Sequence, residues 1–279
     1  MEKYKIERNS VQETLLIPLY GRKMAVELFP DLFDDVAAVQ LWSKIDYDMA
    51  KQSKLKLKIG AIMAGTRQYD LAAVCRRYLT DHPAAAVVNL GCGLDTTFYS
   101  VANGQARGYN LDFGDVIAVR NQLLPARQLE TNITADLTDY SWLEKIDFDP
   151  ARGAVFFASG LFYYFKKEAV RDLFINMARA FPGAKLAFDA TNAKGLKKMA
   201  KTWLSAAEMA DIGLYFSLES VAELSAWSDD FDNVVQKGYM TGYRSLDKRF
   251  GFWANLLFNH VDKSGLGKII EIEFKKRAL

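Results

Sequence analysis

Two glycines just after an apolar run are the residues of this chain whose type and spacing most directly suggest chemistry. Residues 84–88 (AAAVV) are apolar, and residues 89–93 (NLGCG) place glycine at 91 and 93. A short apolar run ending in closely spaced glycines predicts a buried strand that turns into a helix. Because glycine lacks a Cβ, the backbone at Gly91 and Gly93 can bend sharply and approach a ligand. The pattern predicts a nucleotide cradle, although such glycines also occur in α/β proteins without one.

The residues that follow narrow the choice of nucleotide. A dinucleotide fingerprint of the G-x-G-x-x-G type needs glycine at position 96, and Thr96 there counts against a nicotinamide or flavin cofactor. Asp112 ends a second strand-like segment about 20 residues after the glycines, where a carboxylate can accept hydrogen bonds from both ribose hydroxyls. Asp136, followed by Leu137, ends a third such segment. This order of a glycine turn and two acids is typical of methyltransferases that use S-adenosylmethionine (SAM).

An arginine upstream of the glycines has two possible roles. Arg67 and Asp70 lie three residues apart within residues 65–70 (GTRQYD), in a helical pattern. They could form a surface ion pair, which contributes little to stability. Alternatively, Arg67 reaches over the carboxyl edge of the sheet and binds a carboxylate with its planar guanidinium. The residues alone leave both interpretations open.

Alternating strand and helix patterns would position these residues. We expect strands at residues 84–88, 108–112, 130–136, 153–158, 184–190, 234–241 and 269–275, and helices at residues 14–23, 34–46, 55–79, 115–124, 140–145, 167–181 and 248–261. The pattern predicts an α/β fold, a doubly wound Rossmann-like sheet of seven mostly parallel strands with N-terminal helices and a helical lid insertion. Its last two strands form an antiparallel pair at one edge. The ligand of such a sheet sits beyond the carboxyl ends of the strands.

Two regions surround this expected core. Residues 1–79 read as an N-terminal helical extension that packs on a SAM-binding core at residues 80–279. Residues 191–233 read as a long helical insertion, rich in methionine and aromatic residues: Met199, Trp203, Met209, Tyr215, Phe216 and Trp227. Such residues at helical spacing usually form a small core. Because the insertion leaves the carboxyl end of the fifth strand, we expect it to roof the substrate pocket as a lid.

The composition excludes several classes of protein. Half of the 279 residues are hydrophobic and a quarter are charged, with a formal net charge of +2. This charge is too small, and too evenly interspersed, to predict a nucleic-acid partner, and the basic run at residues 274–277 reads as a solvated strand end. Cys75 and Cys92 form neither a disulfide framework nor a metal-binding spacing. No apolar run approaches about 18 residues, so we expect no membrane partner and a cytoplasmic location.

Several stretches together resemble the leucine carboxyl methyltransferase family, and in particular its bacterial branch of tetracenomycin-type polyketide O-methyltransferases. They are residues 13–22 (ETLLIPLYGR), 88–96 (VNLGCGLDT), 111–112 (LD), 119–120 (VR), 124–125 (LP) and 141–143 (SWL). The resemblance runs from about residue 13 to residue 190, and the lid and C-terminus match only in layout. It implies a SAM-dependent O-methyltransferase.

The resemblance also implies roles for individual residues. Arg67 would hold the methionine carboxylate of SAM, Gly91 and Gly93 would pass under its methionine portion, Asp112 would bind the ribose, and Asp136 with Leu137 would frame the adenine. The family tends to have a glutamate-glycine pair after the fourth strand, near the SAM amino group, and this chain has Ser159-Gly160. Because serine is uncharged, either another acid compensates or SAM binds more weakly. Thr97 also replaces an arginine that is frequent in the family.

The expected reaction needs no metal and no covalent intermediate, because methyl transfer mainly requires donor and acceptor to be held together away from water. Tyr163 and Tyr164 are the candidate catalytic residues: they would face the sulfonium or hydrogen-bond the acceptor oxygen, unless they only pack under the lid. His82 and His260 both read as remote or structural. This scarcity of bases favours a small-molecule carboxylate or acidic phenol as acceptor.

Two further functions stay open at this point. One is a SAM-binding protein without turnover, which Ser159 makes credible. The other is a nicotinamide-dependent oxidoreductase, which Thr96 counts against. Nothing in the sequence marks a surface for a protein substrate, and the oligomeric state is not predicted.

Overall fold

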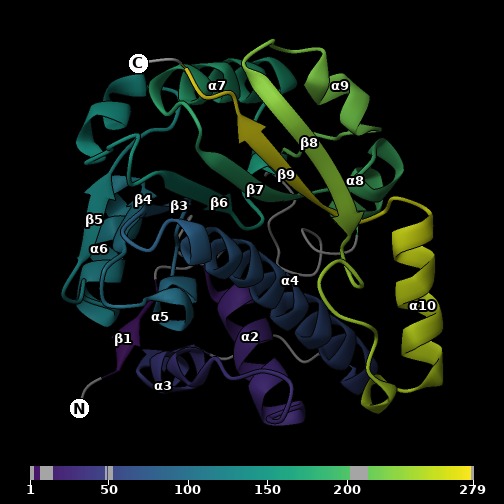
Figure 1. The fold of residues 1–279 in the computed structure, drawn as a ribbon. Coiled ribbons are helices and arrows are strands. Elements are labelled where there is room, and N and C mark those ends of the chain that lie inside the picture. Colours follow the sequence, from purple (N-terminus) through teal and green to yellow (C-terminus); the bar gives the residue numbers. More distant parts are fainter. Residues whose placement is uncertain (1–2, 7–14, 48, 50–52, 202–212, 278–279) are drawn as a thin grey trace.

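A twisted sheet with helices on both faces forms the centre of the molecule (Figure 1). The computed structural model describes residues 3–6, 15–47, 49, 53–201 and 213–277. Within them the main sheet has seven strands in the order β5-β4-β3-β6-β7-β9-β8, all parallel except β9, which is antiparallel to both of its neighbours. The strands are β3 (Ala86–Leu90), β4 (Arg107–Asp112), β5 (Glu130–Thr134), β6 (Ala154–Ala158), β7 (Lys185–Ala190), β8 (Phe231–Gly238) and β9 (Lys268–Phe274). The predicted doubly wound α/β fold is confirmed.

The helices lie where the sequence pattern predicts them, with ends displaced by a few residues. They are α2 (Leu16–Leu28), α3 (Val36–Ser43), α4 (Lys54–Asp81), α5 (Thr97–Val101), α6 (Gly114–Leu123), α7 (Lys167–Ala180), α8 (Ala193–Met199), α9 (Val221–Ser225) and α10 (Phe252–Lys263), with 3-10 turns η1 (Tyr140–Lys145), η2 (Phe162–Tyr164) and η5 (Lys248–Phe250). None of the helices in the described ranges is both long and apolar enough to cross a lipid bilayer.

The central strands are buried on both faces, which explains their unbroken apolar sequence. Along β6, Val155 and Phe157 pack with the buried side of α4, and Phe156 packs with α7. α4, in the part of the chain that we expected to pack on the core as an N-terminal extension, therefore crosses one face of the sheet directly (Figure 1). It ends at Asp81, two residues beyond that expected extension.

The register brings the ends of the strands together at one edge. Leu90, the last residue of β3, is level with Leu111 of β4 and with Ala158 of β6. The residues that follow these strands therefore meet. The strand order also reverses direction at β3, the point at which ligands bind in open α/β sheets.

Two strands are displaced from their expected positions, and one pair of strands was not expected. β3 begins two residues later than expected and includes Asn89, whose Nδ2 donates a 3.1 Å hydrogen bond to Oδ1 of Asp95. β8 begins at Phe231 and ends at Gly238, so the last three residues of the expected lid belong to the sheet. A two-stranded parallel pair, β1 (Tyr4–Lys5) with β2 (Ile45–Asp46), was not predicted.

The expected lid is only partly helical where it is described. Its two helices, α8 and α9, flank an extended stretch whose Phe216 and Leu218 are fully buried in the main core, and Trp227 packs against the same cluster. The interpretation as core is thus confirmed for Phe216 and Trp227. Trp203 and Met209 fall at residues 202–212, outside the described residues.

Candidate functional site

The turn after β3 requires glycine at both predicted positions. Gly91 has φ +62° and Gly93 has φ +45°, which are left-handed conformations that other residues rarely adopt. A Cβ on Gly91 would lie 2.4 Å from Cδ1 of Leu161, and one on Gly93 would lie 3.1 Å from Cδ2 of Leu15. The turn is therefore closely packed on both sides, so the packing of the protein by itself favours glycine at both positions.

Asp112 joins the end of β4 to this turn. Its Oδ2 accepts a 2.8 Å hydrogen bond from the backbone N–H of Gly93, and its Oδ1 accepts one of 2.8 Å from the N–H of Phe113. Burial raises the pKa of Asp112, and these two hydrogen bonds act in the opposite direction. A carboxylate has about four lone-pair sites, so both oxygens can still accept hydrogen bonds from a ligand.

The predicted adenine residues lie one strand further out. Asp136 is exposed after β5, and its Oδ1 accepts hydrogen bonds from the backbone and hydroxyl of Thr138. The backbone N–H of Ala135 donates to the carbonyl of Asp112, which ties the two strand ends together at 2.9 Å. Leu137 points into the main core, where its carbonyl accepts from the indole of Trp142. Asp136 is therefore accessible, whereas the side chain of Leu137 is 5 % exposed.

Arg67 forms an ion pair that the sequence did not suggest. Its Nη1 lies 3.1 Å from Oδ2 of Asp189, a residue of β7 that is 2 % exposed. Of the two interpretations left open, the surface pair with Asp70 is excluded, because Asp70 is fully buried and neither of its oxygens has a hydrogen-bond partner among the described residues. Arg67 does reach the carboxyl edge of the sheet, where it binds a carboxylate of the protein itself, that of Asp189.

The two predicted tyrosines differ sharply in their surroundings. Tyr163 is 5 % exposed, and its hydroxyl donates a 3.0 Å hydrogen bond to Oδ2 of Asp189. Burial, together with the negative charge of Asp189, raises its pKa well above the ordinary value. Tyr164 is 42 % exposed, and burial of its hydroxyl end raises its pKa as well. Neither phenol can serve as a base near neutral pH.

The position after β6 is built around Gly160. This residue has φ +71°, and its N–H donates a 2.6 Å hydrogen bond to Oδ1 of Asp189. A Cβ on it would lie 2.9 Å from Nη1 of Arg67. Ser159 is partly exposed beside it, at the level of Asp189 on the neighbouring strand, since the register pairs Ala158 with Phe188. Sequence reasoning missed Asp189, because it sits near the end of the mostly apolar strand segment AKLAFDA.

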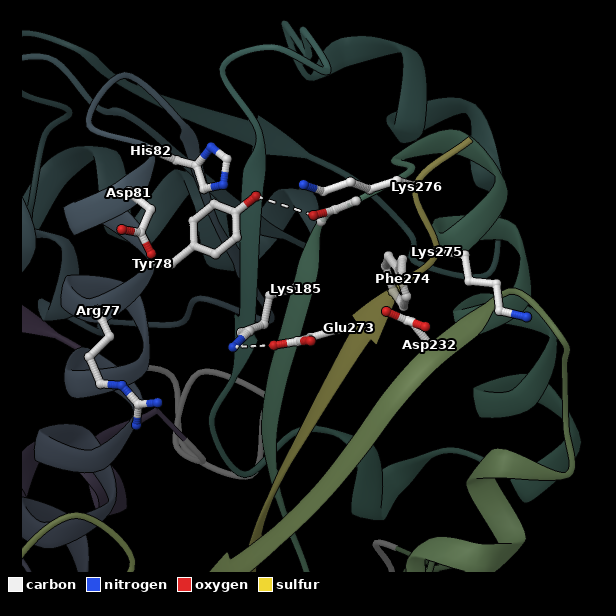
Figure 2. Close-up of a pocket in the computed structure, with 12 residues that line it drawn as sticks. Arg77, Tyr78, Asp81, His82, Lys185, Asp232, Glu273, Phe274, Lys275 and Lys276 are labelled. Atoms are coloured by element: carbon white, nitrogen blue, oxygen red, sulfur yellow. Dashed lines mark hydrogen bonds and ion pairs between the residues drawn. The ribbon is translucent and has the colours of Figure 1, made fainter. Parts of the chain in front are cut away.

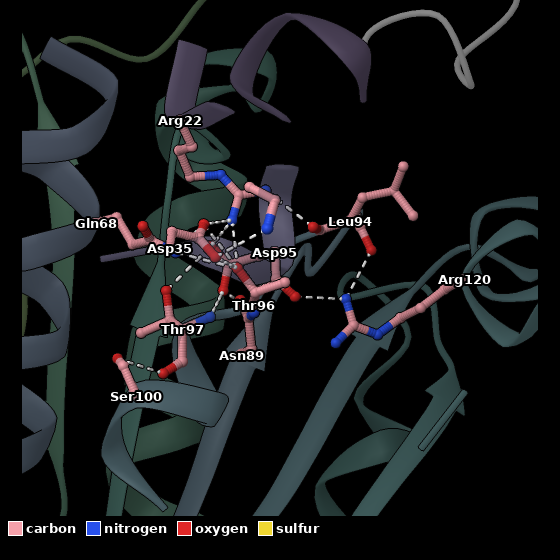
Figure 3. A network of polar contacts seen from close by, with 12 residues as sticks. Arg22, Asp35, Gln68, Asn89, Leu94, Asp95, Thr96, Thr97, Ser100 and Arg120 are labelled. Carbon is pink, nitrogen blue, oxygen red and sulfur yellow. Dashed lines mark hydrogen bonds and ion pairs between the residues drawn. The ribbon is translucent and has the colours of Figure 1, made fainter. Parts of the chain in front are cut away.

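The N-terminal helices hold the far side of the glycine turn through a buried polar network (Figure 3). The guanidinium of Arg22 donates to the hydroxyl of Thr96 at 2.8 Å and to the carbonyl of Leu94 at 2.8 Å, and it pairs with Asp35 at 2.9 Å. Gln68 donates to the same threonine and the same aspartate. Thr96, which stands where a dinucleotide fingerprint has glycine, thus anchors the turn to α2, α3 and α4.

A second arginine supports the turn from the other side. Arg120 on α6 is 1 % exposed, and its Nη1 donates to the carbonyls of Gly93 and Asp95 at 2.9 and 2.8 Å. Asp95 in turn caps α5 by accepting hydrogen bonds from the backbone and hydroxyl of Thr97. Sequence reasoning noted this arginine only as part of a family motif.

Comparison with known proteins decides the family. The sequence profile described as leucine carboxyl methyltransferase matches residues 15–178, which is more than half of the chain. The chain belongs to this family. Its sequence is 28% identical over 186 residues to the tetracenomycin polyketide synthesis O-methyltransferase TcmP of Streptomyces glaucescens, covering 66% of this chain and 67% of that protein. It is 24% identical over 193 residues to the S-adenosyl-L-methionine-dependent methyltransferase dpfgK of Gibberella zeae, covering 65% of each.

Solved methyltransferase structures share the fold. A protein from Thermobifida fusca YX assigned as a methyltransferase superposes with a TM-score of 0.57 at 16% identity, covering 91% of this chain and 94% of that one. The plantazolicin methyltransferase BpumL, solved with a triazolic desmethylPZN analogue and SAH, gives a TM-score of 0.50 at 14% identity over 96% of this chain and all of that one. The predicted family and fold are therefore confirmed.

The relatives point to S-adenosylmethionine, since dpfgK is described as dependent on it and BpumL was solved with SAH. The chain fits the group at the carboxyl edge of the sheet. Gly91 and Gly93 present bare backbone in left-handed conformations, and Asp112 places a carboxylate between that turn and β5. Ser159 is level with Asp189 of the neighbouring strand β7, so Asp189 is the acid nearest in register to this serine.

A cleft of about 590 Å³ lies at the amino edge of the sheet, opposite the carboxyl edge that carries the residues described above (Figure 2). It is lined by the end of α4, the start of β7 and the end of β9, and its walls carry both signs of charge, with Lys185 paired to Glu273 at 2.8 Å. His82 stacks on Tyr78 there, which agrees with the prediction that this histidine is remote from the site. Cys75 and Cys92 are both buried, and burial raises the pKa of each thiol.

Proposed function

We propose that this protein transfers the methyl group of SAM to an oxygen atom of a small molecule, and that the acceptor arrives already ionised. The observation that supports SAM binding most directly is the hydrogen bond between Asp112 and the N–H of Gly93. This hydrogen bond holds the carboxylate of Asp112, which we propose binds the ribose, against the turn that we propose passes under the methionine portion. O-methylation follows from the similarity to TcmP, whose name describes an O-methyltransferase.

In this proposal the two halves of SAM meet different parts of the chain. Asp112 accepts hydrogen bonds from the ribose hydroxyls, and Asp136 with Leu137 lies beside the adenine. Gly91 and Gly93 pass under the methionine portion, with Ser159 nearby, and Arg67 binds its carboxylate through N–H donors that Asp189 leaves unused. A guanidinium has five N–H donors, so one ion pair does not exhaust it.

The preference for an ionised acceptor rests on the residues around Tyr163. Its hydroxyl is committed to Asp189, and its raised pKa keeps it protonated. His82 lies at the opposite end of the sheet and His260 lies on α10. A carboxylate needs no base, and an acidic phenol such as a polyketide phenol needs little help, whereas an alcohol needs a strong base.

The bound cofactor supplies an electrophilic methyl group on a positively charged sulfur. The chain has to orient the acceptor in line with it and exclude water. Tyr164, 42 % exposed at the turn after β6, is the aromatic residue proposed to face the sulfonium or the acceptor. The residues after β7 are proposed to roof the acceptor.

The test is a transfer assay with SAM labelled in its methyl group and a panel of small carboxylic acids, phenols and alcohols. Label in an ester, released as methanol by mild base, identifies a carboxylate acceptor. Base-stable label identifies an ether, and the compound of the panel that carries it distinguishes a phenol from an alcohol. Saturable SAM binding with no transfer across the panel would instead favour a SAM-binding protein without turnover.

A further inference from the structure

We infer that Asp189 is a positioning and charge-compensating residue of the SAM site, which fixes Arg67 and offsets its positive charge beside the sulfonium. The inference rests on the proposed function. It gives a role to a buried carboxylate that lies outside the residues predicted from the sequence.

The hydrogen bonds of Asp189 are what set it apart. Its Oδ1 accepts from the N–H of Gly160 at 2.6 Å, and its Oδ2 accepts from Tyr163 at 3.0 Å and from Arg67 at 3.1 Å. It is 2 % exposed, so it is screened little by water. The three donors come from the turn after β6, from η2 and from α4, and Asp189 therefore ties these three segments together at the carboxyl edge of the sheet.

Burial makes this carboxylate necessary for Arg67. The guanidinium side chain is 15 % exposed and cannot lose its proton, so it needs a counter-charge. A Cβ on Gly160 would come within 2.9 Å of it, so the guanidinium also lies against the backbone after β6. Arg67 is thereby held in one rotamer, and its remaining N–H donors are pre-organised for a ligand.

Charge gives the pair a second consequence. An unpaired arginine at this edge would repel the sulfonium of SAM, and the neutral sulfur of the product S-adenosylhomocysteine (SAH) would feel no such repulsion. With Asp189 present, the net charge of the pair is zero. The pair therefore lets SAM bind without a penalty relative to SAH.

The test compares the dissociation constants of SAM and SAH by calorimetry at pH 8 for the full chain and two variants of opposite sign. Asp189→Asn removes a negative charge and keeps the shape, so the ratio of the SAM constant to the SAH constant should rise on the order of tenfold, the effect of one charge at about 10 Å in a protein of effective dielectric about 20. Arg67→Gln removes a positive charge and should lower the same ratio. Its loss of the shared carboxylate contact weakens both ligands and cancels in the ratio.

Tyr163→Phe is the matched control, because it removes a hydrogen bond to Asp189 without changing charge. It should leave the ratio within twofold of the wild-type value. Equal ratios of the SAM and SAH constants in the wild type and all three variants would overturn the inference. If Asp189→Asn does not fold, a ratio in Arg67→Gln that is unchanged or raised would overturn it as well. Failure of the proposed function is a different result, since the wild-type protein would then bind neither ligand.

Discussion

Arg67 and Gln68 are neighbours on α4, yet their side chains bond to different parts of the sheet edge. Arg67 pairs with Asp189 on β7, whereas Gln68 donates to Thr96 at the glycine turn and to Asp35. β3 and β7 are separated by β6, so one turn of α4 connects both sides of the point where the strand order reverses. The N-terminal helices thus contribute side chains to the candidate site.

Asp35→Asn should destabilise the fold. Asp35 and Arg22 form an ion pair whose side chains are 9% and 6% exposed. Removing Asp35 as a charged partner leaves the buried Arg22 with a longer ion pair to Asp95 at 3.7 Å, and we expect the free energy of unfolding to fall by about 2 kcal/mol. Urea unfolding measures this change. Asp34→Asn alters an exposed neighbour and should change it by less than about 0.5 kcal/mol; equal effects of the two variants would refute a role for the buried network.

Asp70→Asn should stabilise the protein at neutral and alkaline pH. Burial raises the pKa of Asp70 from its ordinary value of 3.8 to about 8, and its nearest charged groups are Arg244, Asp262 and Lys237. The unfolded chain ionises above pH 3.8 while the folded chain retains the proton, so the wild-type protein loses stability as pH rises between these two values. At pH 7 this loss is on the order of 4 kcal/mol.

The measurement for Asp70 is chemical unfolding at several pH values. The advantage of the asparagine variant should be large at pH 8 and fade below pH 4, where both side chains are neutral. Asp81→Asn, at the exposed end of the same helix, is the control and should show no such trend. A pH-independent difference for Asp70→Asn would show that ionisation is not its cause.

Gly160→Ala should weaken SAM binding through Arg67. The substitution costs about 1 kcal/mol at the left-handed φ of +71° and also places a Cβ 2.9 Å from Nη1 of Arg67. Gly104→Ala carries the same backbone cost at φ +83° but meets no atom within 4 Å. We expect both variants to lose similar stability in thermal unfolding and only Gly160→Ala to bind SAM more weakly, by fivefold or more in calorimetry. Equal SAM affinities of the two variants would show that Gly160 has no role in SAM binding.

The rate of methyl transfer to a carboxylate should be insensitive to pH between about 6 and 9. Tyr163 has a pKa well above its ordinary value because it is buried, His82 lies at the amino edge of the sheet, and His260 is exposed on α10. The pH profile of kcat/KM for the best acceptor in the panel measures this. A rate that rises tenfold per pH unit around neutrality would reveal a catalytic base that the account lacks.

Much of the fold follows from local pattern. The apolar runs at β3, β6 and β7 are read directly because both faces of these strands are buried, and Gly91 and Gly93 are read because only glycine fits the turn. The sequence pattern predicts a helix through Phe216 and Leu218, where the structure has an extended stretch. Aromatic spacing cannot distinguish a helix from a coil that crosses the core.

The pairing inside the site was not readable in the same way. Asp189 lies 122 residues after Arg67 and looks like an irregularity in an apolar strand. Its role depends on α4 crossing the sheet above β7, a long-range packing that no local spacing encodes. Arg22 and Asp35 were missed for the same reason, because their partner Thr96 is distant in sequence.

Calorimetric titration of SAM into the wild-type protein and into Asp112→Ala tests the central claim most directly. Asp112 bonds to the N–H of Gly93 and is expected to bind the ribose. The account predicts saturable binding at one site in the wild-type protein and at least a 30-fold weaker constant in the variant, with both proteins folded by circular dichroism. Absence of heat with the wild-type protein, or equal affinity of a folded Asp112→Ala variant, would contradict it.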